Sequence, residues 1–135
     1  MNIAIVGVGY VGLVSGACFS KMGLNVVCAD IDENKIQRLL KGDILIFEPK
    51  LDAMVLRNMK EGRLRFTTNL ISCLDDVEIV FSAVGAPIDE KSFRIPDWKA
   101  VRKAMIGSVV VDGRNIYDSK ELKNEGFIYM GASRS

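Results

Sequence analysis

Short apolar runs alternate with amphipathic stretches along most of the chain. Most runs are rich in β-branched residues and end at a glycine or a polar turn, which is typical of strands buried on both faces of a parallel sheet. The stretches between them repeat apolar residues at helical spacing. This pattern predicts strands at Ile3–Val6, Asn25–Ala29, Arg63–Phe66, Glu78–Val84, Ser108–Val111 and Phe127–Met130. It predicts helices at Leu13–Met22, Glu33–Leu40 and Leu51–Met59, a short one ending at Leu74, one that Asp97 caps and Met105 ends, and a short one that Asp118 begins.

The regular alternation of strands and helices predicts an α/β fold with a doubly wound parallel sheet of the Rossmann type. Right-handed crossovers and the two-half plan of such sheets give about six strands in the order 3-2-1-4-5-6. The chain has 135 residues, which fits a single domain. Residues 88–96 mix charge, serine and proline without a period, so this segment is the best candidate for a linker.

The helix predicted at Glu33–Leu40 has the clearest start and stop signals. Asp32 is a candidate N-cap, and Gly42 stands where the helix would end. The apolar residues Ile36, Leu39 and Leu40 are expected to face the core.

A glycine fingerprint joins the first predicted strand to the first helix. It reads Gly7-Val8-Gly9-Tyr10-Val11-Gly12, and dinucleotide-binding loops have this spacing and this position. The first glycine permits a tight turn, the second lets the backbone approach a pyrophosphate, and the third lets the helix pack closely on the sheet. Free N–H groups at the helix start then meet the phosphates. We therefore expect these residues to bind a dinucleotide. The alternative, a glycine-rich turn that binds nothing, does not explain the acid at the end of the next strand.

That acid is Asp30. We expect its carboxylate to accept hydrogen bonds from the ribose hydroxyls of the adenosine. A 2′-phosphate would be repelled there, because Asp32 and Glu33 are also close, so the site favours NAD over NADP. A strand-end helix cap is the alternative role of Asp30. Lys35 is placed to reach the same pocket, although a solvated helix lysine satisfies the spacing equally well.

Two further turns follow the ends of predicted strands. Val84-Gly85-Ala86-Pro87 ends the fourth strand, which flanks the switch point where such sheets bind ligands. We expect this loop to touch the cofactor, with a plain turn as the alternative. Asp112-Gly113-Arg114-Asn115 ends the fifth strand, and an arginine can grip a phosphate with two donors. By its chemistry alone, the alternative is a polar strand-end turn without a ligand.

Composition removes several other chemistries. The chain has 18 Lys and Arg against 17 Asp and Glu, so its charge gives no case for nucleic acid or an acidic membrane. It has no histidine, which removes a His-based triad and most zinc sites, so no metal is expected. Cys18, Cys28 and Cys73 lie in apolar runs without C-x-x-C spacing, so we expect buried, reduced thiols. Without a signal peptide or a run that spans a bilayer, the expected location is cytoplasmic.

The chain resembles the UDP-glucose/GDP-mannose dehydrogenase family in two separate parts. Residues 1–89 resemble the N-terminal, NAD-binding domain of that family. This match rests on the glycine fingerprint, on Phe47-Glu48-Pro49, on Phe66-Thr67-Thr68-Asn69-Leu70 and on Val84-Gly85-Ala86-Pro87. Residues 90–135 resemble the end of the family's C-terminal, UDP-binding domain, and this match rests on Phe93–Trp98, Val109–Tyr117 and Gly126–Gly131. The chain is thus similar to a family member whose middle is missing, folded as one dinucleotide-binding domain over residues 1–135.

This resemblance implies NAD as the cofactor. It implies cofactor contacts at Gly7–Gly12, Asp30, Lys35 and Val84–Pro87. Ala86 stands where the family usually has threonine, so one hydroxyl contact is lost. Arg114 resembles an arginine that reaches the nucleotide sugar, often across a subunit contact.

Family members oxidise the 6-hydroxyl of a nucleotide sugar to a carboxylate in two hydride transfers. They use a cysteine in a Gly-Gly-Ser-Cys-Phe-Pro-Lys segment, with a lysine and an asparagine from a central helical domain. None of the three cysteines here matches that segment. The resemblance therefore implies the NAD-binding portion of an oxidoreductase of the UDP-glucose 6-dehydrogenase type, without catalytic residues and inactive alone. Whether the chain is itself an enzyme stays open.

Two alternatives remain from the sequence. The first is a non-catalytic nucleotide-binding or subunit-interaction module. The second, a small oxidoreductase with another substrate, ranks last because no Tyr-x-x-x-Lys pair is present. The expected partners are the nucleotide sugar in the full enzyme and a second copy of the chain, which would hide apolar surface that the missing middle covers. No nucleic acid or membrane partner is expected.

Overall fold

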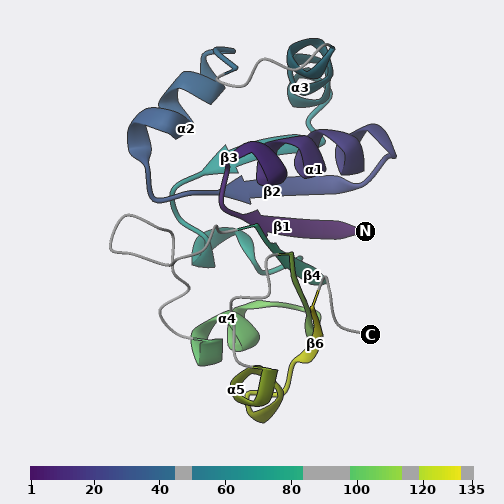
Figure 1. The fold of residues 1–135 in the computed structure, drawn as a ribbon, viewed down its shortest axis with the longest axis vertical. Helices are drawn as coiled ribbons and strands as arrows, with labels where there is room; N and C mark the ends of the chain where they lie inside the picture. The colour runs from purple at the N-terminus through teal and green to yellow at the C-terminus, as the bar shows by residue number, and fades with distance from the viewer. Residues whose placement is uncertain (45–49, 84–97, 114–118, 132–135) are drawn as a thin grey trace.

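A computed structural model describes residues 1–44, 50–83, 98–113 and 119–131 of the chain. Six parallel strands form one sheet in the order β3-β2-β1-β4-β5-β6, which confirms the predicted topology (Figure 1). The strands are β1 (Asn2–Val6), β2 (Asn25–Ala29), β3 (Leu64–Thr67), β4 (Ile79–Ser82), β5 (Val109–Asp112) and β6 (Ile128–Gly131). In the central pair, Ile3 to Val6 of β1 lie opposite Ile79 to Ser82 of β4.

Helices connect these strands as predicted, with shifted ends. They are α1 (Tyr10–Lys21), α2 (Glu33–Leu40), α3 (Leu51–Lys60), the 3₁₀ turn η1 (Ile71–Cys73), α4 (Trp98–Ala104) and α5 (Ser119–Asn124). The first helix begins at Tyr10 rather than Leu13, because Gly9 serves as its N-cap. The predicted caps Asp97 and Asp118 lie outside the described residues. No helix in the described ranges is long and apolar enough to cross a membrane.

Alternate residues of the central strand pack on opposite faces of the sheet. Ile3 and Ile5 belong to one buried cluster, to which α1, α2 and α3 contribute. Ala4 and Val6 belong to the other, to which α4, α5 and the segment around η1 contribute. Because each face is covered over a different set of strands, α1 to α3 gather at the β3 end of the molecule, and α4 and α5 gather at the β6 end (Figure 1).

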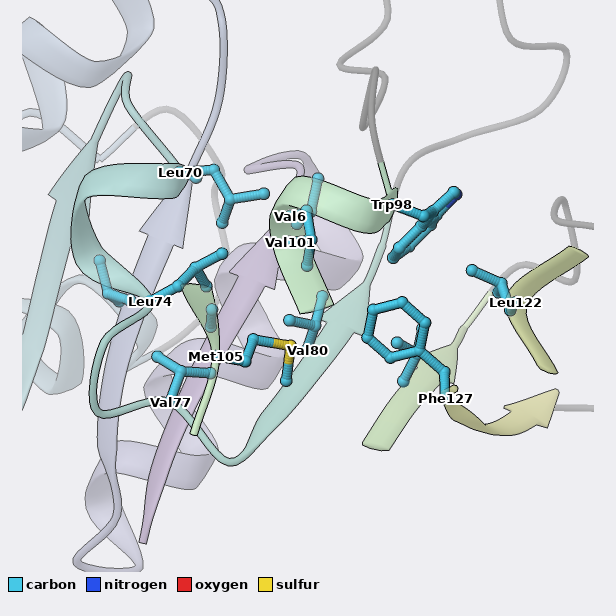
Figure 2. Close-up of a cluster of buried hydrophobic side chains, with 14 residues drawn as sticks. Val6, Leu70, Leu74, Val77, Val80, Trp98, Val101, Met105, Leu122 and Phe127 are labelled. Atoms are coloured by element: carbon cyan, nitrogen blue, oxygen red, sulfur yellow. The ribbon is translucent and has the colours of Figure 1, made fainter. Parts of the chain in front are cut away.

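The second cluster ties the later part of the chain to the central strands. Figure 2 shows Val101 and Met105 of the α4 region close to Val6 and Val80. Beside them the rings of Trp98 and Phe127 meet edge to face, with their centroids 5.4 Å apart. Such aromatic pairs contribute about 1 kcal/mol beyond their buried area. The core therefore runs without interruption from β1 to the last strand.

Two expectations about burial are wrong. Leu40 is 51% exposed, whereas Ile36 and Leu39 of the same helix are buried. The helix has only eight residues, so its narrow contact stripe reaches the sheet through two side chains. Cys18 is also exposed, on the outer face of α1, while Cys28 is buried and Cys73 is half-buried.

The end signals of α2 are confirmed. The side chain of Asp32 accepts a hydrogen bond from the Lys35 N–H at 3.1 Å, as an N-cap does. Gly42 follows the helix with a φ of +86°, a conformation that glycine adopts without steric cost.

Candidate cofactor-binding site

The glycine fingerprint forms the turn between β1 and α1, at the carboxyl edge of the sheet. Gly7 has a φ of +96° and donates its N–H to the carbonyl oxygen of Ala29 at 2.8 Å. A Cβ at Gly12 would lie 1.8 Å from the carbonyl oxygen of Gly7, so no side chain fits there. At Gly9, by contrast, nothing lies within 4 Å of the Cβ position. The three glycines thus provide the tight turn, the open approach and the close packing that the sequence predicts.

The start of α1 is open to an anion. Gly9 is the N-cap and provides no side-chain hydrogen bond, and the first turn contains no acidic residue. The first N–H groups of a helix have no acceptor within the helix, and the positive end of the helix dipole lies there. Tyr10 is 54% exposed and Val11 is half-buried at this position. A phosphate group is the ligand that such a helix start favours.

Asp30 lies beside this turn, at the end of β2, and is only 8% exposed. Its Oδ2 accepts a hydrogen bond from the Val8 N–H at 2.9 Å, and its Oδ1 accepts one from the Asp32 N–H at 3.0 Å. The carboxylate therefore holds the glycine turn against the end of β2. The N-cap of α2 is Asp32, so the alternative role of Asp30 as a helix cap is wrong.

The contact between Asp30 and Val8 was missed by sequence reasoning. It joins residues 22 apart in the chain, and its only sequence signal is the fingerprint followed by an acid. A carboxylate has about four lone-pair positions, and the described bonds use two of them. Asp30 thus keeps acceptor capacity for hydroxyl donors at this edge.

Lys35 lies at the same place. Its Nζ is 3.7 Å from Oδ2 of Asp30, and its side chain is 30% exposed. The structure thus places the ammonium group of Lys35 beside the Asp30 carboxylate.

The other predicted site residues, Val84, Gly85, Ala86, Pro87 and Arg114, lie outside the described residues. The strands that precede them end at the same edge of the sheet as the glycine turn. The Cβ of Ala83, which follows β4, lies 3.5 Å from the Cβ position of Gly12. The Gly113 N–H, which follows β5, donates to the carbonyl oxygen of Ser82 at 2.8 Å.

Asp112, which the sequence groups with Arg114, makes a contact within the sheet. It is fully buried, and its Oδ2 accepts a hydrogen bond from the hydroxyl of Tyr129 at 2.8 Å. This bond joins β5 to β6 across the face that α4 and α5 cover. No pattern in the sequence predicted this pair.

The thiols differ in accessibility and acidity. Burial raises the pKa of Cys28 from 9.0 to about 12, and its Sγ lies 2.9 Å from the Cβ position of Gly16. Burial also raises the pKa of Cys73, whose Sγ donates to the carbonyl oxygen of Leu70. The thiolate is the nucleophilic form of cysteine, so both groups are poorly suited to attack a carbonyl. Cys18 lies on α1 and is exposed.

A parallel sheet in this order, with a glycine turn at the first strand end and an acid at the second, defines a dinucleotide-binding Rossmann domain. Sequence comparison gives the family. The model of the "UDP-glucose/GDP-mannose dehydrogenase family, NAD binding domain" matches residues 1–116. The chain belongs to the UDP-glucose/GDP-mannose dehydrogenase family and carries its NAD-binding domain, so its cofactor is NAD.

Curated relatives agree with this assignment. The UDP-glucose 6-dehydrogenase of Rhizobium meliloti (strain 1021) is 53% identical over 87 residues, which are 64% of this chain and 20% of that protein. The UDP-glucose 6-dehydrogenase TuaD of Bacillus subtilis (strain 168) is 48% identical over 89 residues, or 66% of this chain and 19% of that protein. The chain thus spans about a fifth of the length of these relatives.

A solved structure extends the similarity to nearly the whole chain. The GDP-mannose dehydrogenase from Pseudomonas aeruginosa superposes with a TM-score of 0.75 at 25% identity, covering 97% of this chain and 35% of that one. A UDP-glucose dehydrogenase from Pyrobaculum islandicum shares the fold with a TM-score of 0.73, covering 96% of this chain and 34% of that one.

Proposed function

We propose that Gly7 to Gly12, Asp30 and Lys35 hold NAD at the carboxyl edge of the sheet. The observation that carries this proposal is the uncapped start of α1 beside a buried carboxylate. The pyrophosphate binds the open N–H groups after Gly9, where no atom lies within 4 Å of the Cβ position. The adenosine ribose donates its hydroxyls to Asp30, whose carboxylate has lone pairs beyond the two that its described hydrogen bonds use. The residues present therefore fit the cofactor.

Selectivity for NAD over NADP follows from the same carboxylate. Asp30 is buried and already fixed by two backbone N–H groups, so it cannot turn away from a 2′-phosphate. Like charges at close range repel strongly where water is excluded. Lys35 stands 3.7 Å from Asp30 and partly offsets that charge without removing the repulsion.

The loop Val84-Gly85-Ala86-Pro87 completes the cofactor site in this proposal. Its support is the resemblance of this segment to the family motif and the position of Ala83 beside Gly12. Arg114 is assigned to the nucleotide sugar on resemblance alone.

The full protein to which this domain corresponds oxidises a nucleotide sugar of the UDP-glucose type. NAD accepts the hydride in such an oxidation, and the domain binds and orients NAD. The 135 residues contain no segment like the family's cysteine motif, and two of the three thiols have raised pKa values. We therefore assign no catalytic residue to this chain and expect no turnover from it alone. We place the protein in the cytoplasm.

The domain is a composite in this proposal, with residues 90–135 corresponding to the end of the UDP-binding domain. Its support is the length of the alignments with curated relatives, which span 87 to 90 of the 135 residues. The later part supplies β5 and β6, which complete the sheet.

A subunit-interaction role is the second candidate, and one observation favours it. Ile128 and Met130 of the edge strand β6 are 58% and 56% exposed, on the face of the sheet opposite α4 and α5. Exposed apolar residues on an open sheet edge favour association with another chain. A concentration-dependent mass in sedimentation experiments supports self-association, and a constant monomer mass contradicts it.

The experiment that tests the cofactor site is the Asp30→Asn variant. We expect its NAD affinity to fall by about tenfold or more, because it loses a charged acceptor. Its preference for NAD over NADP should shrink, since the negative charge is gone. Calorimetric titration with both cofactors measures the two effects.

Asp43→Asn is the matched control. Asp43 is exposed, follows α2 and pairs with Arg38, so the same chemical change there leaves cofactor binding unaltered. Circular dichroism of both variants reports whether they fold. Unchanged NAD affinity in folded Asp30→Asn contradicts the proposed site.

A further inference from the structure

A cavity lies away from the glycine turn. It has a volume of about 410 Å³ and lies between the C-terminal end of α1, the helix α3 and the start of β3. Its lining residues are Lys21, Lys50, Ala53, Met54, Arg57, Asn58 and Arg63. Helix α1 rises 1.5 Å per residue, so Lys21 at its end lies about 16 Å along the helix from Tyr10 at its start. The cavity is therefore separate from the cofactor site.

Positive charge dominates the cavity lining. Four of its residues are Lys or Arg and none is acidic. The adjacent Glu61 meets Arg57 at 3.5 Å and also pairs with Arg63. Across the described ranges, neither Lys21 nor Lys50 has an acidic side chain within ion-pair distance. Among the described residues, Glu61 is thus the only acid within ion-pair distance of these four cations, which leaves a local excess of positive charge.

One wall of the cavity is formed by a buried side chain with fixed hydrogen bonds. Asn58 is 2% exposed, its Nδ2 donates to the carbonyl oxygen of Met54, and its Oδ1 accepts from Arg63 at 3.3 Å. Nε of Arg63 is buried and has no hydrogen-bond partner. A buried donor without an acceptor is unfavourable, so the Arg63 guanidinium is held beside the cavity at a cost in free energy.

Lys50 shows a second unusual feature. Its φ is +69°, and it is the one non-glycine residue with a positive φ among the described residues. An L side chain is disfavoured in this left-handed conformation, which glycine adopts freely. A residue that keeps a strained conformation at a cavity indicates a role for its side chain. Here that side chain adds a cation to the lining, beside the first turn of α3.

We propose that this cavity binds a phosphorylated small molecule. Its phosphate is held by Lys50, Arg57 and Arg63, since guanidinium groups match phosphate oxygens and lysine adds a point charge. Its nonpolar portion lies against Ala53 and Met54. A volume of about 410 Å³ falls within the range of ordinary ligand sites. The site is independent of NAD, so the two ligands bind together.

The test is titration of the NAD-saturated protein with phenyl phosphate, with inorganic phosphate as the reference. Saturating NAD keeps both probes from the glycine turn. In amide-resolved NMR spectra we expect saturable shifts at Ala53, Asn58 and Arg63 and none at Gly7 to Gly12. Phenyl phosphate should bind several-fold more tightly than phosphate, because its ring covers apolar lining. Absence of saturable shifts at the cavity overturns the proposal.

Lys50→Gly separates binding from stability. The substitution removes the unfavourable backbone conformation, so the Tm should rise by about 2 °C. It also removes one cation, so the affinity for phenyl phosphate should fall about fivefold. Arg57→Gln should weaken binding similarly while Lys50 stays in place. A Lys50→Gly protein with raised Tm and unchanged phenyl phosphate affinity contradicts the assigned role.

Lys60→Gln is the matched control for charge. Lys60 ends the same helix and does not line the cavity. Its affinity for phenyl phosphate should equal that of the unchanged protein. An equal loss of affinity in Lys60→Gln and Arg57→Gln would show diffuse attraction by the helix rather than a site.

Discussion

Gly12 and Gly107 meet the same steric limit in the two halves of the sheet. A Cβ would lie 1.8 Å from the Gly7 carbonyl oxygen at Gly12, and 2.2 Å from the Glu78 carbonyl oxygen at Gly107. Gly12 lies at the carboxyl edge of the sheet, in the first turn of α1. Gly107 lies at the amino edge, before β5, where its N–H donates to the Val77 carbonyl oxygen. An irreplaceable glycine therefore marks close packing, and only its position decides whether it also shapes a site.

Two buried acids extend the same comparison. Asp30 in the first half bonds two backbone N–H groups at the edge where the helix start is uncapped. Asp112 in the second half bonds the Tyr129 hydroxyl within the sheet. Both end a parallel strand, yet only Asp30 lies beside open space at Gly9. The carboxylate in the first half thus holds the glycine turn, and the carboxylate in the second half joins two strands of the sheet.

Alanine at the two glycines gives the largest expected effects. Gly12→Ala and Gly107→Ala should each lower the free energy of unfolding by about 3 kcal/mol, since the new Cβ collides with backbone. Gly12→Ala should also abolish NAD binding, whereas the folded fraction of Gly107→Ala should keep its affinity. Urea denaturation and NAD titration measure the two effects. Retained NAD binding in Gly12→Ala would remove the distinction between the two glycines.

Truncation of the two cores tests whether the halves fold together. Leu39 and Leu122 are both buried, in the first and second clusters respectively. Leu39→Ala and Leu122→Ala should each cost about 3 kcal/mol through lost burial and cavity formation. In both variants the protein should still unfold in one transition, because the sheet is continuous. A separate early transition in Leu122→Ala would show that the second half unfolds alone.

Alkaline pH should lower the stability of the protein through Cys28, which lies in the first half. The second half has no such group, because the chain has no cysteine after Cys73. Burial raises the pKa of Cys28 to about 12 from 9.0, so the unfolded state loses its proton first as the pH rises. The stability contributed by the neutral thiol is present below pH 9 and is lost between pH 9 and pH 12. The expected slope is roughly 1 kcal/mol per pH unit for this group.

Urea denaturation between pH 8 and about pH 10.5 measures the slope. Over this interval the Cys28 thiol stays protonated in the folded state and loses its proton in the unfolded state. Cys28→Ala is the control, because it removes the titrating group while leaving the other charges in place. Its stability should fall less steeply with pH than that of the unchanged chain. Equal slopes in the two proteins would show that this thiol is not held neutral by burial.

The smallest expected effect is at Leu40. Because its side chain is 51% exposed, Leu40→Gln should change the free energy of unfolding by less than about 0.5 kcal/mol. Comparing its free energy of unfolding with that of Leu39→Ala in the same assay shows which of the two side chains contributes to the core. If Leu40→Gln lowered the free energy of unfolding nearly as much as Leu39→Ala, Leu40 would belong to the core, as the sequence predicts.

The sequence predicted the elements and the strand order because buried parallel strands leave continuous apolar runs with glycine at their ends. It predicted the glycine turn because each glycine there meets a separate steric requirement. It did not predict that Asp30 would bond the Val8 N–H, since this contact depends on how the turn folds back on β2. It also misplaced Leu40, because helical spacing gives a face but not the width of its contact.

Sequence reasoning could not predict the cavity between α1 and α3 either. Lys21 and Arg63 stand far apart in the chain, and the packing of α1 against α3 and the start of β3 brings them to one lining. Scattered lysines and arginines are ordinary surface residues in a sequence with nearly balanced charge. Only tertiary structure distinguishes those that gather.

Calorimetric titration of the purified chain with NAD, and with NADP in parallel, tests the central claim most directly. The account predicts saturable binding of one NAD per chain and much weaker binding of NADP, because an open helix start receives the pyrophosphate and Asp30 repels a 2′-phosphate. Absence of NAD binding by the folded chain, or equal affinity for the two cofactors, would contradict it.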